Sequence, residues 1–155
     1  MKNLFFVLAL AASSPVCAQL TDRTTQIHLL VDSKNYVFHA TTATSQDGAV
    51  KSLTSEYVLT LTPDSIACDL PYFGRAFAAS GSDDVGIVFT SKDFSYDVQQ
   101  TKKGGWEVAI KPKDVKKEAS QMHLSIRANG LTTLRVTAPN KDPMTFDGEI
   151  TSPGQ

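Results

Sequence analysis

The feature that most constrains this chain is an alternation of apolar and polar residues, which returns in short runs closed by turn signals. The clearest runs are Phe94–Gln100 and Trp106–Lys111, with two glycines in the segment between them. Successive side chains of a β-strand point to opposite faces, so a period of two indicates half-buried strands. The glycines favour a hairpin turn between these two strands.

Turn signals recur about every 8–12 residues along the chain, and the runs between them predict about eight or nine short strands. We therefore predict a single all-β domain, built as an antiparallel barrel or sandwich. A lipocalin-like meander is favoured because most connections have hairpin length. The pattern leaves open whether the fold is a barrel or a sandwich, and whether its interior is filled.

A short N-terminal helix is predicted over Thr21–Asn35, because Ile27, Leu30 and Val31 follow the i, i+3, i+4 spacing of an amphipathic helix.

Two dipeptides predict tight turns. Pro63-Asp64 predicts the turn of one hairpin, and Asn129-Gly130 predicts a two-residue type I′ turn in another. A two-residue loop at Asn129-Gly130 would place Arg127 opposite Thr132. Thr132, however, has the parity of the apolar-face residues on its strand, so a bulge or a longer loop stays open as an alternative.

The N-terminus has the layout of a secretory signal peptide. Lys2 precedes a short apolar run, and small residues around Ala18 suit cleavage. We predict that residues 1–18 are the signal peptide and that residues 19–155 form the mature β domain. The apolar run is too short to span a bilayer, so we expect no transmembrane helix after cleavage.

This signal predicts a protein that is periplasmic or secreted. Lipid anchoring at Cys17 is the alternative, but Val16 is not the small residue that a lipoprotein signal places before its cysteine. Removing Lys2 from 15 basic and 16 acidic residues leaves a net charge of −2. A near-neutral chain lacks the basic character of a general nucleic-acid binder, so we expect no nucleic-acid partner.

No motif in the sequence predicts a catalytic, metal or cofactor site. His28, His39 and His123 lie far apart, whereas zinc sites normally have local pairs of ligands. Cys68 shares a strand face with apolar neighbours and is predicted to be a buried apolar residue rather than a reactive thiol. We therefore predict no enzyme activity, no cofactor and no metal.

Aromatic residues gather in the stretch Leu70–Phe77, outside any alternating pattern. Pro71 lacks a backbone donor and Gly74 permits a tight turn, so the stretch is predicted to form an aromatic corner after a strand. Its residues either pack one end of the core or contact a ligand, with Arg75 facing an anion. The candidate ligand-binding residues are Tyr72, Phe73, Arg75, Phe77 and Trp106.

The stretch Leu-Pro-Tyr-Phe-Gly-Arg-Ala-Phe at 70–77 resembles the motif of the uncharacterised domain-of-unknown-function family 4251. Residues 36–40, 89–96 and 146–150 fit the same pattern, and the resemblance covers nearly all of the predicted mature chain. Phe77 stands where a tyrosine is expected. The resemblance implies an exported protein of Gram-negative gut bacteria, and it brings no activity, cofactor or catalytic residue.

Two functions from different classes remain. The first is a periplasmic binding or carrier module that encloses a small apolar or anionic ligand in an underfilled barrel. The second is an envelope-associated interaction domain that binds a protein or a glycan and no small molecule. A filled interior would count against the first, and an exposed aromatic corner would favour the second. We assume a monomer, and the sequence identifies neither ligand nor partner.

Overall fold

The computed structural model describes residues 16–75, 86–115, 119, 121–139 and 141–154. Within them, one helix, α1 (Val16–Ser33), precedes ten strands. The strands are β1 (Tyr36–Thr44), β2 (Val50–Ser52), β3 (Val58–Thr62), β4 (Ser65–Pro71), β5 (Gly86–Ser91), β6 (Phe94–Gln100), β7 (Trp106–Pro112), β8 (Gln121–Ile126), β9 (Leu131–Ala138) and β10 (Lys141–Thr151).

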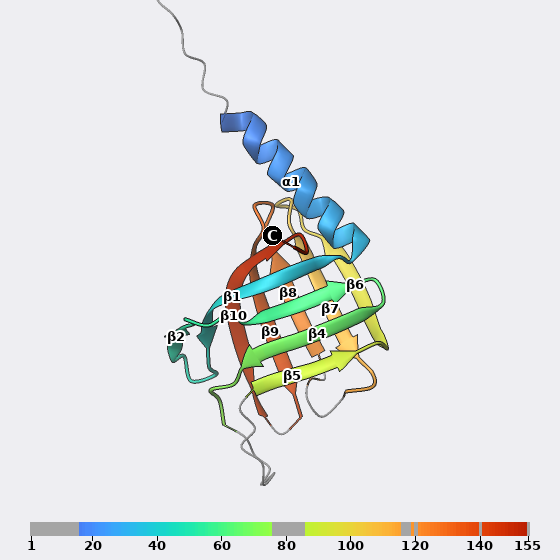
Figure 1. Ribbon diagram of the computed structural model, residues 1–155. Helices are drawn as coiled ribbons and strands as arrows, with labels where there is room; N and C mark the ends of the chain where they lie inside the picture. The colour runs from blue at the N-terminus through green and yellow to red at the C-terminus, as the bar shows by residue number, and fades with distance from the viewer. Residues whose placement is uncertain (1–15, 76–85, 116–118, 120, 140, 155) are drawn as a thin grey trace, which may run out of the picture.

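The strands form one antiparallel sheet that curls into a nearly closed barrel, with α1 across one end (Figure 1). The order is β5-β4-β3-β1-β10-β9-β8-β7-β6, and β2 pairs with β1 beside this path. The first and last strands thus pair in the middle of the sheet, while β5 and β6 are its two edges. The predicted all-β meander is confirmed.

Apolar side chains fill the interior of the barrel. The predicted faces of β1 are correct, because Tyr36 and Phe38 are buried while Val37 and His39 lie on the other side. Cys68 is 3% exposed, and burial raises the pKa of its thiol far above the ordinary value. The largest fully buried side chains are Tyr36, Phe38, Phe146, Leu59, Leu61, Ile66, Leu70, Ile110, Met122, Leu124, Leu134 and Met144.

Helix α1 closes one end of the barrel. The predicted face is correct, since Ile27 and Val31 are buried, but the helix begins at Val16, before the predicted Thr21. Tyr96 of β6 donates a hydrogen bond from its hydroxyl to the carbonyl of Val31 at 3.1 Å. The last helical turn is therefore tied to an edge strand of the sheet.

Three hairpin loops share one geometry. Each has three residues and ends in a glycine with positive φ: Gly48 (87°), Gly104 (80°) and Gly130 (89°). The N–H group of each glycine donates to the carbonyl three residues earlier, at 3.0, 3.1 and 2.8 Å respectively. This is the turn with a left-handed third residue that commonly closes three-residue hairpins, and glycine adopts that conformation without steric cost.

The type I′ turn predicted at Asn129-Gly130 is therefore wrong, and the longer loop is correct. Arg127 donates from its backbone N–H to the carbonyl of Leu131 at 2.8 Å. Thr132 pairs with Ile126 and is buried, as its parity indicated. The two-residue turn predicted at Pro63-Asp64 is confirmed, because Thr62 pairs directly with Ser65.

A β-bulge in β1 separates two parts of this strand that pair with different neighbouring strands. The register with β10 shifts between Ala40, which pairs with Gly148, and Thr42, which pairs with Asp147. Thr41 is the extra residue, and its hydroxyl donates to the carbonyl of Asp147 at 2.9 Å. Before the bulge β1 also pairs with β3, and after it β1 pairs with β2. Sequence alternation missed β2 because its three residues are all exposed.

A bend, and not a hairpin, joins β5 to β6. Only Lys92 and Asp93 separate the two strands, yet they do not pair. The carboxylate of Asp114 accepts the hydroxyl of buried Ser91 and the N–H of Lys92, the latter at 3.2 Å. The Ser91 hydrogen bond is the main cause of a lowered pKa of Asp114. These contacts hold the chain in a corner, from which the two edge strands diverge.

Substitution of Gly148 tests the tight passage beside the bulge. A Cβ at Gly148 would lie 1.9 Å from the carbonyl oxygen of His39, whereas a Cβ at Gly104 would meet nothing within 4 Å. We expect Gly148→Ala to cost about 3 kcal/mol or more of unfolding free energy, because backbone must move. Gly104→Ala should cost only about 1–2 kcal/mol, from its positive φ alone. Equal costs in urea unfolding would contradict this account.

Candidate functional site: the aromatic corner and the outer groove

The aromatic corner, Tyr72–Arg75, follows β4 at the end of the barrel away from α1 (Figure 1). The carbonyl of Arg75 accepts the hydroxyl of Tyr72 and the N–H of Asp142, the latter at 3.0 Å. The hydroxyl of Tyr72 passes over Gly74, where a Cβ would lie 2.6 Å from it. The corner is thus a folded turn, fastened to the start of β10.

Two lysines lie over the rings of this corner. The Nζ atom of Lys51 is 4.1 Å from the ring centroid of Phe73, and that of Lys141 is 5.1 Å from the ring centroid of Tyr72. Phe73 is nevertheless 40% exposed. Partial burial is the main cause of the raised pKa of Tyr72. The corner therefore presents aromatic surface and positive charge together.

A pocket of about 480 Å³ opens beside the corner. Among the described residues, the guanidinium of Arg75 forms no ion pair, although its charge is a minor cause of the lowered pKa of Asp47 in the same pocket. The Ser45 hydroxyl, followed by the N–H of Ala49, lowers the pKa of Asp47, so this carboxylate stays ionised at neutral pH. The lining residues are Ser45, Gln46, Asp47, Phe73, Gly74, Arg75 and Asp142.

The structure brings three of the five predicted ligand-binding residues together: Tyr72, Phe73 and Arg75. Phe77 lies outside the described residues. Trp106 lies at the opposite end of the barrel, 3% exposed, with its ring centroid 5.7 Å from that of His28 in α1. Trp106 therefore belongs to the packing of the helix on the barrel.

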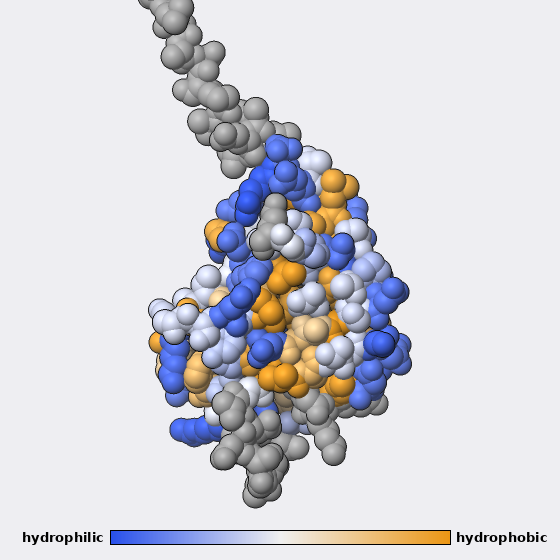
Figure 2. Space-filling model, viewed as in Figure 1, coloured by the Kyte–Doolittle hydropathy of each residue, from blue (hydrophilic) through white to orange (hydrophobic). Residues whose placement is uncertain are grey.

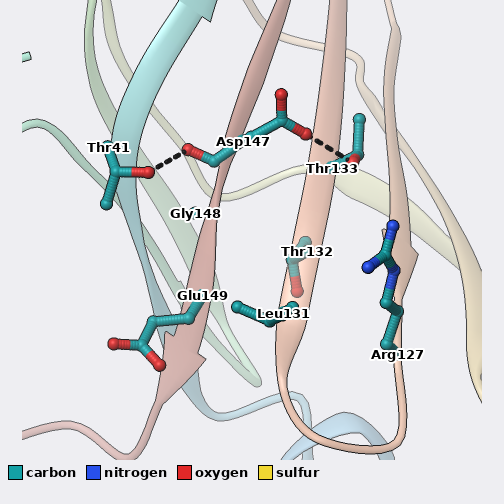
Figure 3. A pocket seen from close by; sticks show the side chains of 8 residues that line it. All are labelled: Thr41, Arg127, Leu131, Thr132, Thr133, Asp147, Gly148 and Glu149. Carbon is teal, nitrogen blue, oxygen red and sulfur yellow. Dashed lines mark hydrogen bonds between the residues drawn. The ribbon is translucent and has the colours of Figure 1, made fainter. Parts of the chain in front are cut away.

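A second hollow, the outer groove, crosses the outside of the sheet and was missed by sequence reasoning. Two pockets of about 310 and 580 Å³ share Arg127 and Thr133. The smaller pocket (Figure 3) is lined by Thr41, Arg127, Leu131, Thr132, Thr133, Asp147, Gly148 and Glu149. The larger is lined by Thr101, Lys103, Gly105, Glu107, Ser125, Ile126, Arg127, Ala128, Asn129 and Thr133.

A row of polar side chains in direct register forms the floor of this groove. Asp147 pairs with Thr133, which pairs with Ser125, which pairs with Glu107. Thr133 donates its hydroxyl to Asp147 at 2.6 Å, and Ser125 donates to both carboxylate oxygens of Glu107 at 2.7 and 2.6 Å. The polar-face positions of four strands could be listed from the sequence, but their alignment depends on loop lengths that the sequence did not resolve.

Ser125, Glu107 and His123 lie together but are not arranged as a catalytic triad. His123 places Nε2 3.5 Å from Glu107, and Ser125 donates to the same carboxylate. A triad needs histidine between serine and acid, so that the imidazole accepts the serine proton. Here the carboxylate of Glu107 stands in the middle, so the imidazole of His123 is not placed between the serine and the acid.

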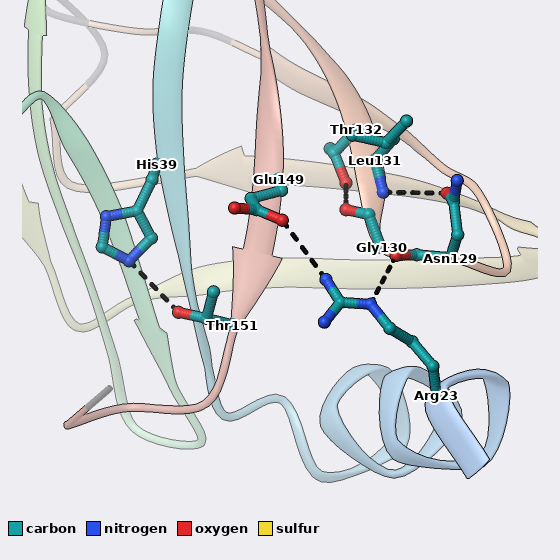
Figure 4. Close-up of polar contacts among 8 residues, drawn as sticks. All are labelled: Arg23, His39, Asn129, Gly130, Leu131, Thr132, Glu149 and Thr151. Carbon is teal, nitrogen blue, oxygen red and sulfur yellow. Dashed lines mark hydrogen bonds and ion pairs between the residues drawn. The ribbon is translucent and has the colours of Figure 1, made fainter. Parts of the chain in front are cut away.

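The outer groove ends at the contacts that fasten α1 to the barrel (Figure 4). Arg23 donates from Nε to the carbonyl of Asn129 at 2.8 Å and from Nη2 to Glu149 at 3.2 Å. Ile27 packs on Gly130, because a Cβ at Gly130 would lie 2.9 Å from the Cδ1 atom of Ile27. On the next strand, His39 and Thr151 form a hydrogen bond of 3.1 Å.

The part of the chain that the structure describes shows neither a cluster of metal ligands nor a helix that could span a membrane. Those residues contain no group of three or more histidine, cysteine, aspartate or glutamate side chains placed to hold a metal ion. The described helix is not long and apolar enough to cross a membrane.

The fold and site define a nearly closed antiparallel β-barrel, in which the described inward side chains are buried and pockets lie on the exterior. The model of the family "Domain of unknown function (DUF4251)" matches residues 18–150, so the chain belongs to the DUF4251 family. The crystal structure of a DUF4251 family protein from Bacteroides eggerthii has the same fold, with a TM-score of 0.64 and 15% sequence identity. That likeness covers 87% of this chain and 91% of the other. No match was found among curated proteins.

Substitutions at the corner separate folding from recognition. Arg75 contributes its backbone carbonyl to the turn, so we expect Arg75→Ala to change the unfolding free energy by less than about 0.5 kcal/mol. Tyr72→Phe removes the hydroxyl that donates to this carbonyl and should cost about 1 kcal/mol. Thermal or urea unfolding of both variants measures the difference. A larger loss for Arg75→Ala would show that its side chain is structural.

Proposed function

We propose that the protein is an exported interaction domain that binds another polypeptide at the aromatic corner. The observation that carries this proposal is the pocket beside Arg75, whose guanidinium lacks an ion pair among the described residues while Phe73 remains exposed. An exposed aromatic ring beside an arginine is typical of interaction surfaces, in which both residue types are enriched.

The packing of the barrel favours a site on the exterior. The side chains that point inward from β1, β3, β4 and β7–β10 are almost entirely buried against one another. An enclosed ligand would require space among these side chains, and protein interiors rarely contain voids larger than a water molecule. A ligand at the corner requires no such space.

The charges of the corner favour a polypeptide as the ligand. Arg75 suits a carboxylate, which it can bind in a bidentate manner, while Asp47 and Asp142 suit a basic group. A peptide segment supplies both charges and an apolar side chain for Phe73. A glycan would use an aromatic face for stacking, but Lys51 already covers one face of Phe73.

The proposed location rests on the N-terminal signal. The charged start, the apolar run and the small residues before Gln19 are typical of a secretory signal peptide. The family match begins at residue 18, beside the proposed cleavage site. Determination of the N-terminal residue of the protein purified from cells tests this, with Gln19 expected and Met1 contradicting export by cleavage.

A small anionic ligand is the second candidate for the same pocket. Its volume of about 480 Å³ falls within the range of roughly 300–1,000 Å³ that is usual for small-molecule sites. In this case Arg75 would bind the anion, and Phe73 would cover it.

Site-specific photo-crosslinking tests the proposed partner. A photoreactive phenylalanine analogue replaces Phe73 in the full chain expressed in its native envelope, and cross-linked peptides are identified by mass spectrometry. We expect cross-links to one defined polypeptide partner. The cross-linking yield should fall at least tenfold in the Arg75→Ala background, which is on the order of the effect of losing one charged hydrogen bond.

The matched control places the analogue at Val50, which is 65% exposed on β2. Cross-links from position 73 that position 50 does not give, and that depend on Arg75, support the proposal. Identical cross-links from both positions, or none from position 73, would contradict it.

A further inference from the structure

The strand β5 is one of the two edges of the sheet, and it carries no charged residue. Its six residues are Gly-Ile-Val-Phe-Thr-Ser, and among the strands that the structure describes only β4 pairs with it. Natural proteins usually protect a sheet edge with a charge, a proline, a bulge or a covering segment, because unpaired N–H and C=O groups can template another strand. The other edge strand, β6, carries Asp97.

The outward side chains of β5 extend an apolar surface. Val88 is 63% exposed and Thr90 is also exposed. With Val58 and Ala67 on the neighbouring strands they line a shallow hollow of about 320 Å³. Figure 2 shows hydrophobic residues gathered on the face that these strands present, with hydrophilic residues around them.

We propose that β5 pairs with β5 of a second copy of this chain, in an antiparallel arrangement about a twofold axis. A twofold interface brings the same patch of both copies together, so the patch must be complementary to itself. Two symmetric registers lie nearest the centre of the strand. In one, Val88 lies opposite Val88 of the second copy, and in the other, Val88 lies opposite Thr90 of the second copy. In both, the row of β-branched side chains continues across the interface.

Charge selects β5 over β6 for this role. A symmetric pair of β6 strands would bring the two Asp97 carboxylates close together, and like charges across strands are destabilising. Beside Val88 on the neighbouring strand lies the carboxylate of Asp69, while that of Asp114 is held at the end of β5 by the hydroxyl of Ser91. Two copies of Asp69 would lie three strand spacings apart, about 14 Å, which exceeds the screening length of about 8–10 Å at moderate salt.

Lys141 marks one end of the available edge. Its Nζ atom lies 3.4 Å from the carbonyl oxygen of Gly86, the first residue of β5. One short strand pair buries less surface than a standard interface of about 1,600 Å². The dimer is therefore reversible and forms as concentration rises.

Sedimentation velocity of the purified protein from micromolar to near-millimolar concentration tests this proposal. We expect a monomer–dimer equilibrium that Val88→Lys and Thr90→Lys each weaken by on the order of tenfold or more, because both copies bring the new charge to the interface. Both positions are exposed in the monomer, so the thermal unfolding midpoint should hold.

Gln99→Lys is the matched control, since it adds the same charge to the exposed side of the other edge strand. A dimer that persists in Gln99→Lys and is lost in the two β5 variants supports the proposal. A wild-type protein that stays monomeric at every concentration would overturn it. So would a dimer that all three variants preserve or all three abolish.

Discussion

The pairing of β1 with β10 is the constraint on which the rest of the structure depends. It joins the two ends of the chain in the middle of the sheet, so the opening of the barrel falls at the bend between β5 and β6. The bulge at Thr41 requires Gly148 opposite it and lets β1 pair with β2 as well as β3. The same pairing places the β1–β2 loop beside Asp142, and thereby shapes the pocket at the aromatic corner.

The barrel serves as a filled scaffold, and its chemistry lies on the surface. Apolar side chains occupy the interior, α1 covers one end, and the corner with Arg75 occupies the other. A rigid scaffold that presents a turn of aromatic and charged residues suits recognition of a partner. The uncharged edge of β5 is a second surface, which meets the corner at Lys141.

Much of the fold could be predicted because strand alternation is a local property. The inward faces of β1, β4 and β7, the helix at Ile27 and Val31, and buried Cys68 all follow from the residues themselves. The Asn129-Gly130 turn was misjudged because the dipeptide suits two loop lengths, and only the parity of Thr132 indicated the longer one. Sequence placed Tyr72, Phe73 and Arg75 together, but Asp47 and Asp142 join them only through the pairing of β1 with β10.

Native mass spectrometry of the protein purified gently from cells tests the central claim, that the interior is filled and ligands bind outside, most directly. The account predicts masses of one or two copies of the polypeptide with no small molecule retained inside. A reproducible additional mass of a few hundred daltons that disappears on denaturation, and that persists in both Arg75→Ala and Arg127→Ala, would contradict it, because neither the corner nor the outer groove would then hold the ligand.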